Sequence, residues 1–102
     1  MKPQLEKIPL DAFVRDFAQG LAPLARKHRV RLKASAREDI VVWADRGDLE
    51  RAVRSLCKSA VSHAKSEVEI RAWVQEGRAI LNVRGNGAGG GANYRCALPL
   101  AS

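Results

Sequence analysis

Two groups of residues in the sequence are of types that bind phosphate. Ser55, Ser59 and Ser62 lie in a predicted helix, and a serine hydroxyl can contact magnesium as it does in P-loops. Five of the eight glycines fall between Gly85 and Gly91, and such a loop presents backbone N–H groups to an anion. The sequence contains no Ser-His-Asp set, metal cluster or P-loop motif. These residues therefore indicate binding rather than a catalytic centre.

The elements that would position these residues follow from hydrophobic periodicity. Apolar residues at helical spacing predict helices over residues 10–27 and 45–64, the second capped by Asp45. Alternating patterns predict strands over residues 30–35, 66–75, 78–84 and 93–98, and the short apolar run 40–44 predicts a central strand. The order predicts one α+β domain over residues 1–102: a two-layer α/β sandwich, with two helices on one face of a mixed sheet of about five strands.

Three segments, in this order, resemble the ATPase domain of bacterial sensor histidine kinases, which has the Bergerat (GHKL) fold. Residues 44–64 resemble the strand end and the N-box helix of that family. Residues 83–89, Val-Arg-Gly-Asn-Gly-Ala-Gly, are similar to its first glycine box, Val-x-Asp-Asn-Gly-x-Gly. Residues 91–100 resemble its closing strand, which ends in Leu-Pro. The resemblance implies a nucleotide site at Ser55, Ser59, Ser62, Gly85, Asn86, Gly87 and Gly89.

The departures from the family pattern imply a degenerate site. Ser55 and Ser59 stand where the family has asparagines, the second of which coordinates magnesium, and Ser62 replaces a basic residue. Gly85 stands where a family aspartate accepts a hydrogen bond from adenine, and its loss costs on the order of 1.5–3 kcal/mol. The segment between the glycine box and the last strand is too short for the family's ATP lid and third helix. We expect a shortened Bergerat fold without a bound cofactor, ATP with magnesium being the weaker alternative.

The net charge of +7 favours acidic partners, and a basic cluster runs from Arg26 to Lys33. No aromatic residues interleave with this basic cluster, so nucleic-acid binding is the less favoured interpretation. The chain lacks an apolar run of the ~20 residues that a membrane helix requires, and its start is too polar for a signal peptide. We therefore expect a cytoplasmic protein in which Cys57 and Cys96 are small buried hydrophobic residues without a disulfide.

Histidine and tryptophan residues add little evidence for catalysis. His28 and His63 lack the acidic neighbour of a phosphoacceptor histidine, and the resemblance makes His63 a packing residue. Trp73 belongs to the polar alternate set of its strand, so it is expected on the uncovered face of the sheet, where it could anchor an interface.

These observations lead to three hypotheses. The first is a non-catalytic, kinase-like module in two-component signalling that binds a histidine kinase or a response regulator, or forms a homodimer. It is favoured because loss of the third helix should uncover apolar sheet surface near the last strand. The second hypothesis is a residual ATP-binding kinase or ATPase domain. The third is a basic nucleic-acid-binding module.

Overall fold

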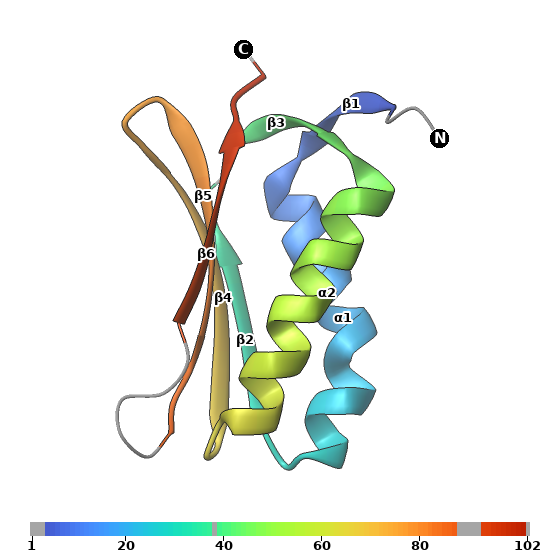
Figure 1. The fold of residues 1–102 in the computed structure, drawn as a ribbon, viewed down its shortest axis with the longest axis vertical. Coiled ribbons are helices and arrows are strands. Elements are labelled where there is room, and N and C mark those ends of the chain that lie inside the picture. Colours follow the sequence, from blue (N-terminus) through green and yellow to red (C-terminus); the bar gives the residue numbers. More distant parts are fainter. Residues whose placement is uncertain (1–3, 38, 88–92, 102) are drawn as a thin grey trace.

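The computed structural model describes residues 4–37, 39–87 and 93–101 (Figure 1). These residues form two helices, and neither of them is long and apolar enough to cross a membrane. The elements in chain order are β1 (Leu5–Pro9), α1 (Leu10–Lys27), β2 (Arg31–Ala36), β3 (Val41–Asp45), α2 (Arg46–His63), β4 (Glu67–Gln75), β5 (Arg78–Gly85) and β6 (Asn93–Pro99).

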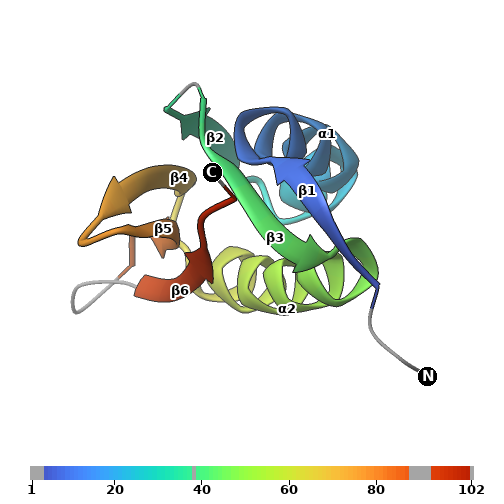
Figure 2. The same cartoon turned by 90° about the horizontal axis from the view of Figure 1, so that it is seen from above.

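A sheet with the order β2-β4-β5-β6 forms one layer, and α1 and α2 form the other (Figure 1). β2 is parallel to β4, whereas β5 is antiparallel to both of its neighbours, β4 and β6, so the sheet is mixed. Both helices lie on the same face of this sheet, which leaves its other face uncovered (Figure 2). The predicted α+β class and two-layer α/β sandwich are therefore confirmed.

The predicted single sheet of about five strands is wrong in its arrangement. β3 is not a central strand: it pairs with β1 in a separate two-stranded sheet that lies across one end of the sandwich (Figure 2). The apolar run of β3 reflects burial against the helices, because Ile40 and Val42 are 2% and 0% exposed while Trp43 is 40% exposed. The described residues connect the two sheets through one isolated bridge, between Val42 and Leu100.

The core lies between the two layers. It is formed by every second residue of the strands and by one stripe of each helix. Along β4 and β5, alternate side chains such as Val68, Ile70 and Leu81 point toward the helices and are buried. The stripe of α2 that faces them includes Val53 and Cys57, both buried as the periodicity predicts. The opposite stripe of α2 stays in solvent, which leaves its polar residues free to contact a ligand or a partner.

α2 begins directly after β3 because Asp45 caps it. The Asp45 carboxylate accepts hydrogen bonds from the backbone N–H of Asp48 at 3.0 Å and of Gln4 at 2.8 Å. These two bonds, the one from Asp48 first, hold the pKa of Asp45 below its ordinary value. The predicted helix cap is confirmed, and it also ties residue 4 to the start of α2.

Candidate functional site

The three serines of the expected nucleotide site lie along one side of α2, away from the core. Their spacing of four and three residues places them on adjacent turns of the same stripe. Ser55 and Ser62 are exposed and Ser59 is half-buried. The Ser59 backbone carbonyl lies 2.8 Å from Nδ1 of His63. His63 is exposed rather than packed as the resemblance implies, and its ring turns back onto the last turn of the helix.

Gly85 is buried at the end of β5, directly beneath α2. A Cβ atom at this position would lie 3.1 Å from the Ala60 carbonyl oxygen, 3.4 Å from the Ala64 Cβ and 3.6 Å from a Val68 methyl. The first of these distances is tighter than ordinary packing, and the backbone of a helix cannot easily retreat. A side chain at residue 85 would therefore crowd the helix at Ala60, one residue beyond Ser59.

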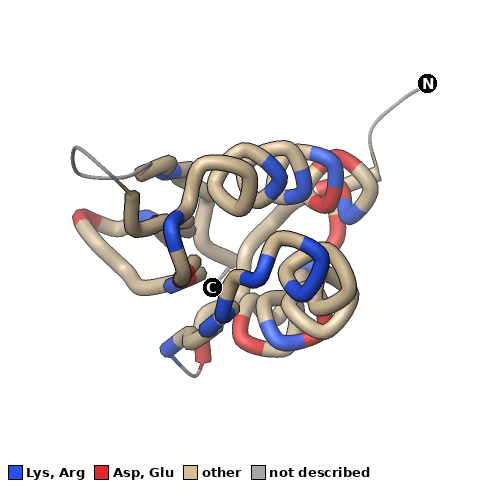
Figure 3. The backbone as a smooth tube through the Cα atoms, turned by 90° about the horizontal axis from the view of Figure 1, so that it is seen from below, with Lys and Arg blue, Asp and Glu red and all other residues tan. Residues whose placement is uncertain are grey.

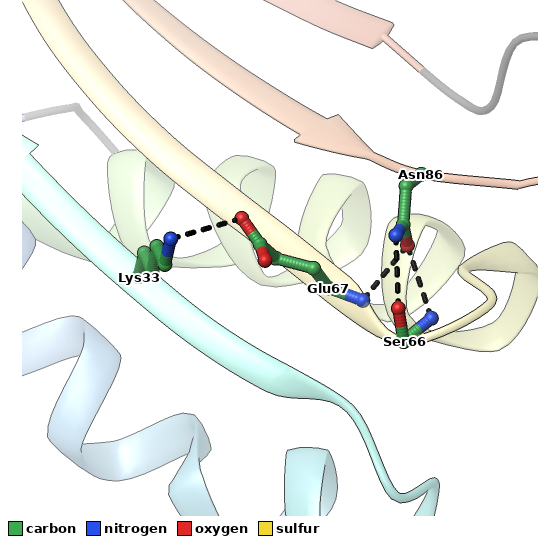
Figure 4. A network of polar contacts seen from close by, with 4 residues as sticks. All are labelled: Lys33, Ser66, Glu67 and Asn86. Atoms are coloured by element: carbon green, nitrogen blue, oxygen red, sulfur yellow. Dashed lines mark hydrogen bonds and ion pairs between the residues drawn. The ribbon is translucent and has the colours of Figure 1, made fainter.

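Asn86 is held by the structure around it rather than left open for a ligand (Figure 4). Its Oδ1 accepts hydrogen bonds from the backbone N–H of Ser66 at 3.0 Å and of Glu67 at 2.8 Å, and its Nδ2 donates to Ser66 Oγ at 2.9 Å. Its own backbone N–H and carbonyl bond to Glu67 and Lys65. Asn86 thus fastens the end of β5 to the turn between α2 and β4.

The glycine loop is described only in part. Gly87 is half-buried and follows Asn86, whereas Gly89 lies outside the described residues. The structure thus places Gly85 against Ala60 of α2, and Asn86 against the turn that follows this helix. It gives no position for the rest of the loop.

The fold is similar to that of several histidine kinases of known structure, although no family model and no curated protein matches the sequence. AdeS of Acinetobacter baumannii superposes with a TM-score of 0.74 and 17% identity, over 87% of this chain and 45% of that one. The catalytic domain of ThkA gives 0.74 and 17%, over 82% and 60%. Full-length ShkA, solved in complex with AMPPNP, gives 0.77 and 19%, over 85% and 19%.

The chain has the fold of a histidine kinase catalytic domain. It spans less than two thirds of the length of each of these kinase structures. The sequence resemblance assigns the N box to α2 and the start of the first glycine box to residues 85–87.

The thiols and acids of this catalytic-domain fold offer no obvious metal centre. No group of three or more His, Cys, Asp or Glu residues converges within the part of the chain that the structure describes. Both cysteines are free; Cys57 is buried, and burial raises the pKa of its thiol to about 12. Cys96 is half-buried, and burial raises its thiol pKa too. Both thiols therefore stay protonated, and Cys57 is confirmed as a small core residue.

The basic cluster that the sequence shows lies where α1 passes into β2 (Figure 3). Arg26, Arg29 and Arg31 line a hollow of about 490 Å3 together with Val30, Ser66 and Glu67. None of these lining residues is aromatic, and His28 is an exposed residue at the end of α1. The cluster is therefore a basic surface that lacks a platform for base stacking.

A second polar group lies on the uncovered face of the catalytic-domain sheet. Trp73 points to this face as predicted, but it is half-buried rather than exposed. Its ring lies 5.4 Å from the guanidinium carbon of Arg95 and 6.0 Å from that of Arg71. The sequence analysis did not single out Asn82, which lies between the two arginines and is only 6% exposed. The sequence feature that could have found Asn82 is its place among the polar alternate residues of β5. Its two neighbouring strands carry arginines at the positions that pair with it.

The helix-facing side of β6 was expected to be uncovered. Its apolar residues Tyr94, Cys96 and Leu98 are half-buried, and Leu56 and Ala64 of the α2 region are half-buried as well. Because these side chains are partly covered, less apolar surface is exposed near β6 than a fully uncovered strand would leave.

Proposed function

We propose that this chain is a degenerate histidine-kinase-like domain that does not catalyse phosphoryl transfer and acts by binding a protein in two-component signalling. The fold supports the kinase-like part of this proposal. The binding role rests on the state of the nucleotide-site positions and on the surface around β6.

The packing of Gly85 carries the proposal. Glycine offers no side chain to the adenine amine, and a Cβ at this position would crowd the Ala60 carbonyl oxygen at 3.1 Å. Loss of that hydrogen bond alone lowers affinity by about ten- to a hundredfold. Ser59 has a shorter side chain than asparagine and lacks the amide group, so it is a poorer ligand for magnesium. Asn86 is occupied by its bonds to Ser66 and Glu67.

A protein partner is supported by the relatives and by the half-buried apolar side chains of β6. ThkA, whose catalytic domain has a similar fold, has been solved in complex with the response regulator TrrA. Tyr94, Cys96 and Leu98 lie next to the α2 side of the sheet, where a docked helix would complete their burial. A response regulator, a histidine kinase or a second copy of this chain fits this role.

Calorimetric titration with ATP and magnesium tests the non-catalytic part. We expect no binding at micromolar ATP and no transfer of labelled γ-phosphate to the protein or to a kinase dimerisation domain. A dissociation constant in the micromolar range would instead support a residual ATP-binding domain and contradict the proposal.

Sedimentation velocity over a hundredfold range of protein concentration tests self-association. If a second copy is the partner, the sedimentation coefficient should rise with concentration, and the exchange of Leu98 for Glu on the helix-facing side of β6 should abolish the rise. A strict monomer that also fails to bind a hydrophobic dye would contradict docking at the β6 surface.

A further inference from the structure

The uncovered face of the four-stranded sheet carries a strong excess of basic residues. Strand register places six Lys or Arg side chains and two Glu side chains on it: Arg31, Lys33, Arg71, Arg78, Arg84 and Arg95, against Glu67 and Glu69. The two glutamates lie at the start of β4, where Glu67 pairs with Lys33 of β2 at 3.3 Å (Figure 4). The part of the face around Arg71 and Arg95 is therefore the more positive part.

Trp73, Arg71 and Arg95 form a cover over the middle of this face, which we call the Trp73 cluster. Trp73 is on β4 and Arg95 is on β6, one strand on either side of β5. Because neighbouring strands are about 4.8 Å apart, a ring and a guanidinium carbon 5.4 Å from each other must meet above β5. The cluster explains why Ile80 and Asn82 are 8% and 6% exposed on a face that no helix covers.

Asn82 is the unsatisfied group beneath this cover. Its register partners are Arg71 on one side and Arg95 on the other. Its Oδ1 is buried and, among the described residues, has no hydrogen-bond donor. A buried acceptor without a donor lowers the stability of the fold, a cost that an aliphatic residue at this position would avoid. The position therefore holds a hydrogen-bonding group at the expense of stability.

We propose that the Trp73 cluster binds an acidic peptide segment of a protein partner. Carboxylates of the segment accept hydrogen bonds from Arg71 and Arg95, the Trp73 ring moves off β5, and Asn82 Oδ1 accepts a hydrogen bond from an N–H of the segment. This proposal rests on the proposed function, because it gives the chemistry of the protein partner. It gives the partner a second contact, on the face opposite α2, in addition to the helix-facing side of β6.

The chemistry of the cluster selects a peptide over other anions. Guanidinium groups bind carboxylates through paired hydrogen bonds, and a peptide also supplies the N–H donors that Asn82 Oδ1 needs. Inorganic phosphate at neutral pH would satisfy the arginines but offers little to an acceptor. Single-stranded nucleic acid binds through successive aromatic platforms, and Trp73 is the one aromatic side chain at the described positions of this face.

The surface beside the cluster has room for further side chains of a bound segment. A hollow of about 440 Å3 lies between Arg78 and Arg95, and Ile80 and Ala97 form its apolar part. Gln75 and Glu76 complete its lining. An acidic residue at the arginines and an apolar residue in this hollow would be compatible with one extended segment.

A fluorescence titration with decaglutamate tests the proposal. The chain has two tryptophans, so Trp43→Phe leaves Trp73 as the only reporter. Its emission should change and saturate as decaglutamate is added at low salt. The double exchange R71Q/R95Q should weaken binding about tenfold or more. The matched exchange R26Q/R29Q removes the same charge from the basic cluster at the end of α1 and should weaken binding less than about threefold.

Asn82→Leu tests whether Asn82 is needed for peptide binding rather than for the stability of the fold. This variant should weaken decaglutamate binding about threefold or more while the midpoint of urea unfolding stays the same or rises. Equal losses in R71Q/R95Q and R26Q/R29Q, unchanged binding in N82L, or tighter binding of a ten-residue oligothymidylate through Arg71 and Arg95 would each overturn the proposal. Nucleotide binding in the ATP titration would contradict the proposed function without changing these results, because that titration reports on the other face.

Discussion

Gly85 is buried against α2, and a Cβ atom there would lie 3.1 Å from the Ala60 carbonyl oxygen. By the sequence resemblance, the kinase family has a carboxylate at this position. The glycine is therefore a matter of packing as well as of chemistry. Only the distance between strand and helix reveals this, and no pattern in the sequence encodes that distance.

Gly85→Asp should therefore destabilise the protein without restoring a nucleotide site. The new Cβ would lie 3.1 Å from the Ala60 carbonyl, and overpacking of this kind costs about 1–3 kcal/mol. Urea unfolding measures the loss, and Gly85→Ala should show much of it because the clash begins at Cβ. An aspartate variant as stable as the parent that binds ATP would show that the helix can yield.

Asp45 gives the start of α2 a dependence on pH. Hydrogen bonds from the N–H groups of Asp48 and Gln4 lower its pKa in the folded chain below the ordinary value of 3.8. Its ionised form therefore stabilises the fold above that value, and the contribution disappears as the pH falls through the lowered pKa. Asp45→Asn keeps a capping oxygen but removes the charge. The Tm difference between parent and variant should shrink in acid, and a constant difference from pH 7 down to pH 2 would contradict this account.

At the level of elements, sequence patterns predict those that carry a continuous apolar stripe. α2 and the β4–β5 hairpin are confirmed because each buries one regular face against the other layer. β1 was missed because only Ile8 among its five residues is buried, so it shows no alternation. Its partner is β3, which follows the whole of α1. The sequence of neither strand specifies which distant strand it pairs with, or in what register.

Asn86 links two elements, and its removal should loosen the junction between β5 and the start of β4. Asn86→Ala removes the acceptor for two backbone N–H groups and the donor to Ser66 Oγ, which should cost about 1–2 kcal/mol at this exposed site. Ser66→Ala removes only the last of these bonds and should cost less than half as much. Hydrogen exchange at Ser66 and Glu67 should speed up in N86A, and unchanged exchange would argue against the linking role.

For the whole molecule, the sequence predicted two layers but not how the strands divide between two sheets. The fold class depends on composition and order, which a sequence contains. Whether β3 joins the larger sheet depends on which strand it pairs with, and the apolar run 40–44 is compatible with either sheet. The Trp73 cluster was missed for a similar reason, since it requires the register of three strands at once.

The residues directly after β6 should contribute to stability where they meet β3. The Ala101 N–H donates to the Val41 carbonyl at 2.8 Å, next to the bridge between Val42 and Leu100. Ala101→Pro removes this donor and should lower the free energy of unfolding by about 1 kcal/mol. Ala101→Gly keeps the N–H and serves as the comparison. Equal stability of the two variants would mean that the contact adds nothing.

Val42 has Ile8 as its partner on one edge of β3 and Leu100 on the other. During synthesis the ribosome makes the first of these partners before both helices and the β4–β5 hairpin, and the second after them. These elements can form before residue 100 has left the exit tunnel, whereas the contact of β3 with Leu100 cannot. Closure of this end of the sandwich is therefore a late event in co-translational folding.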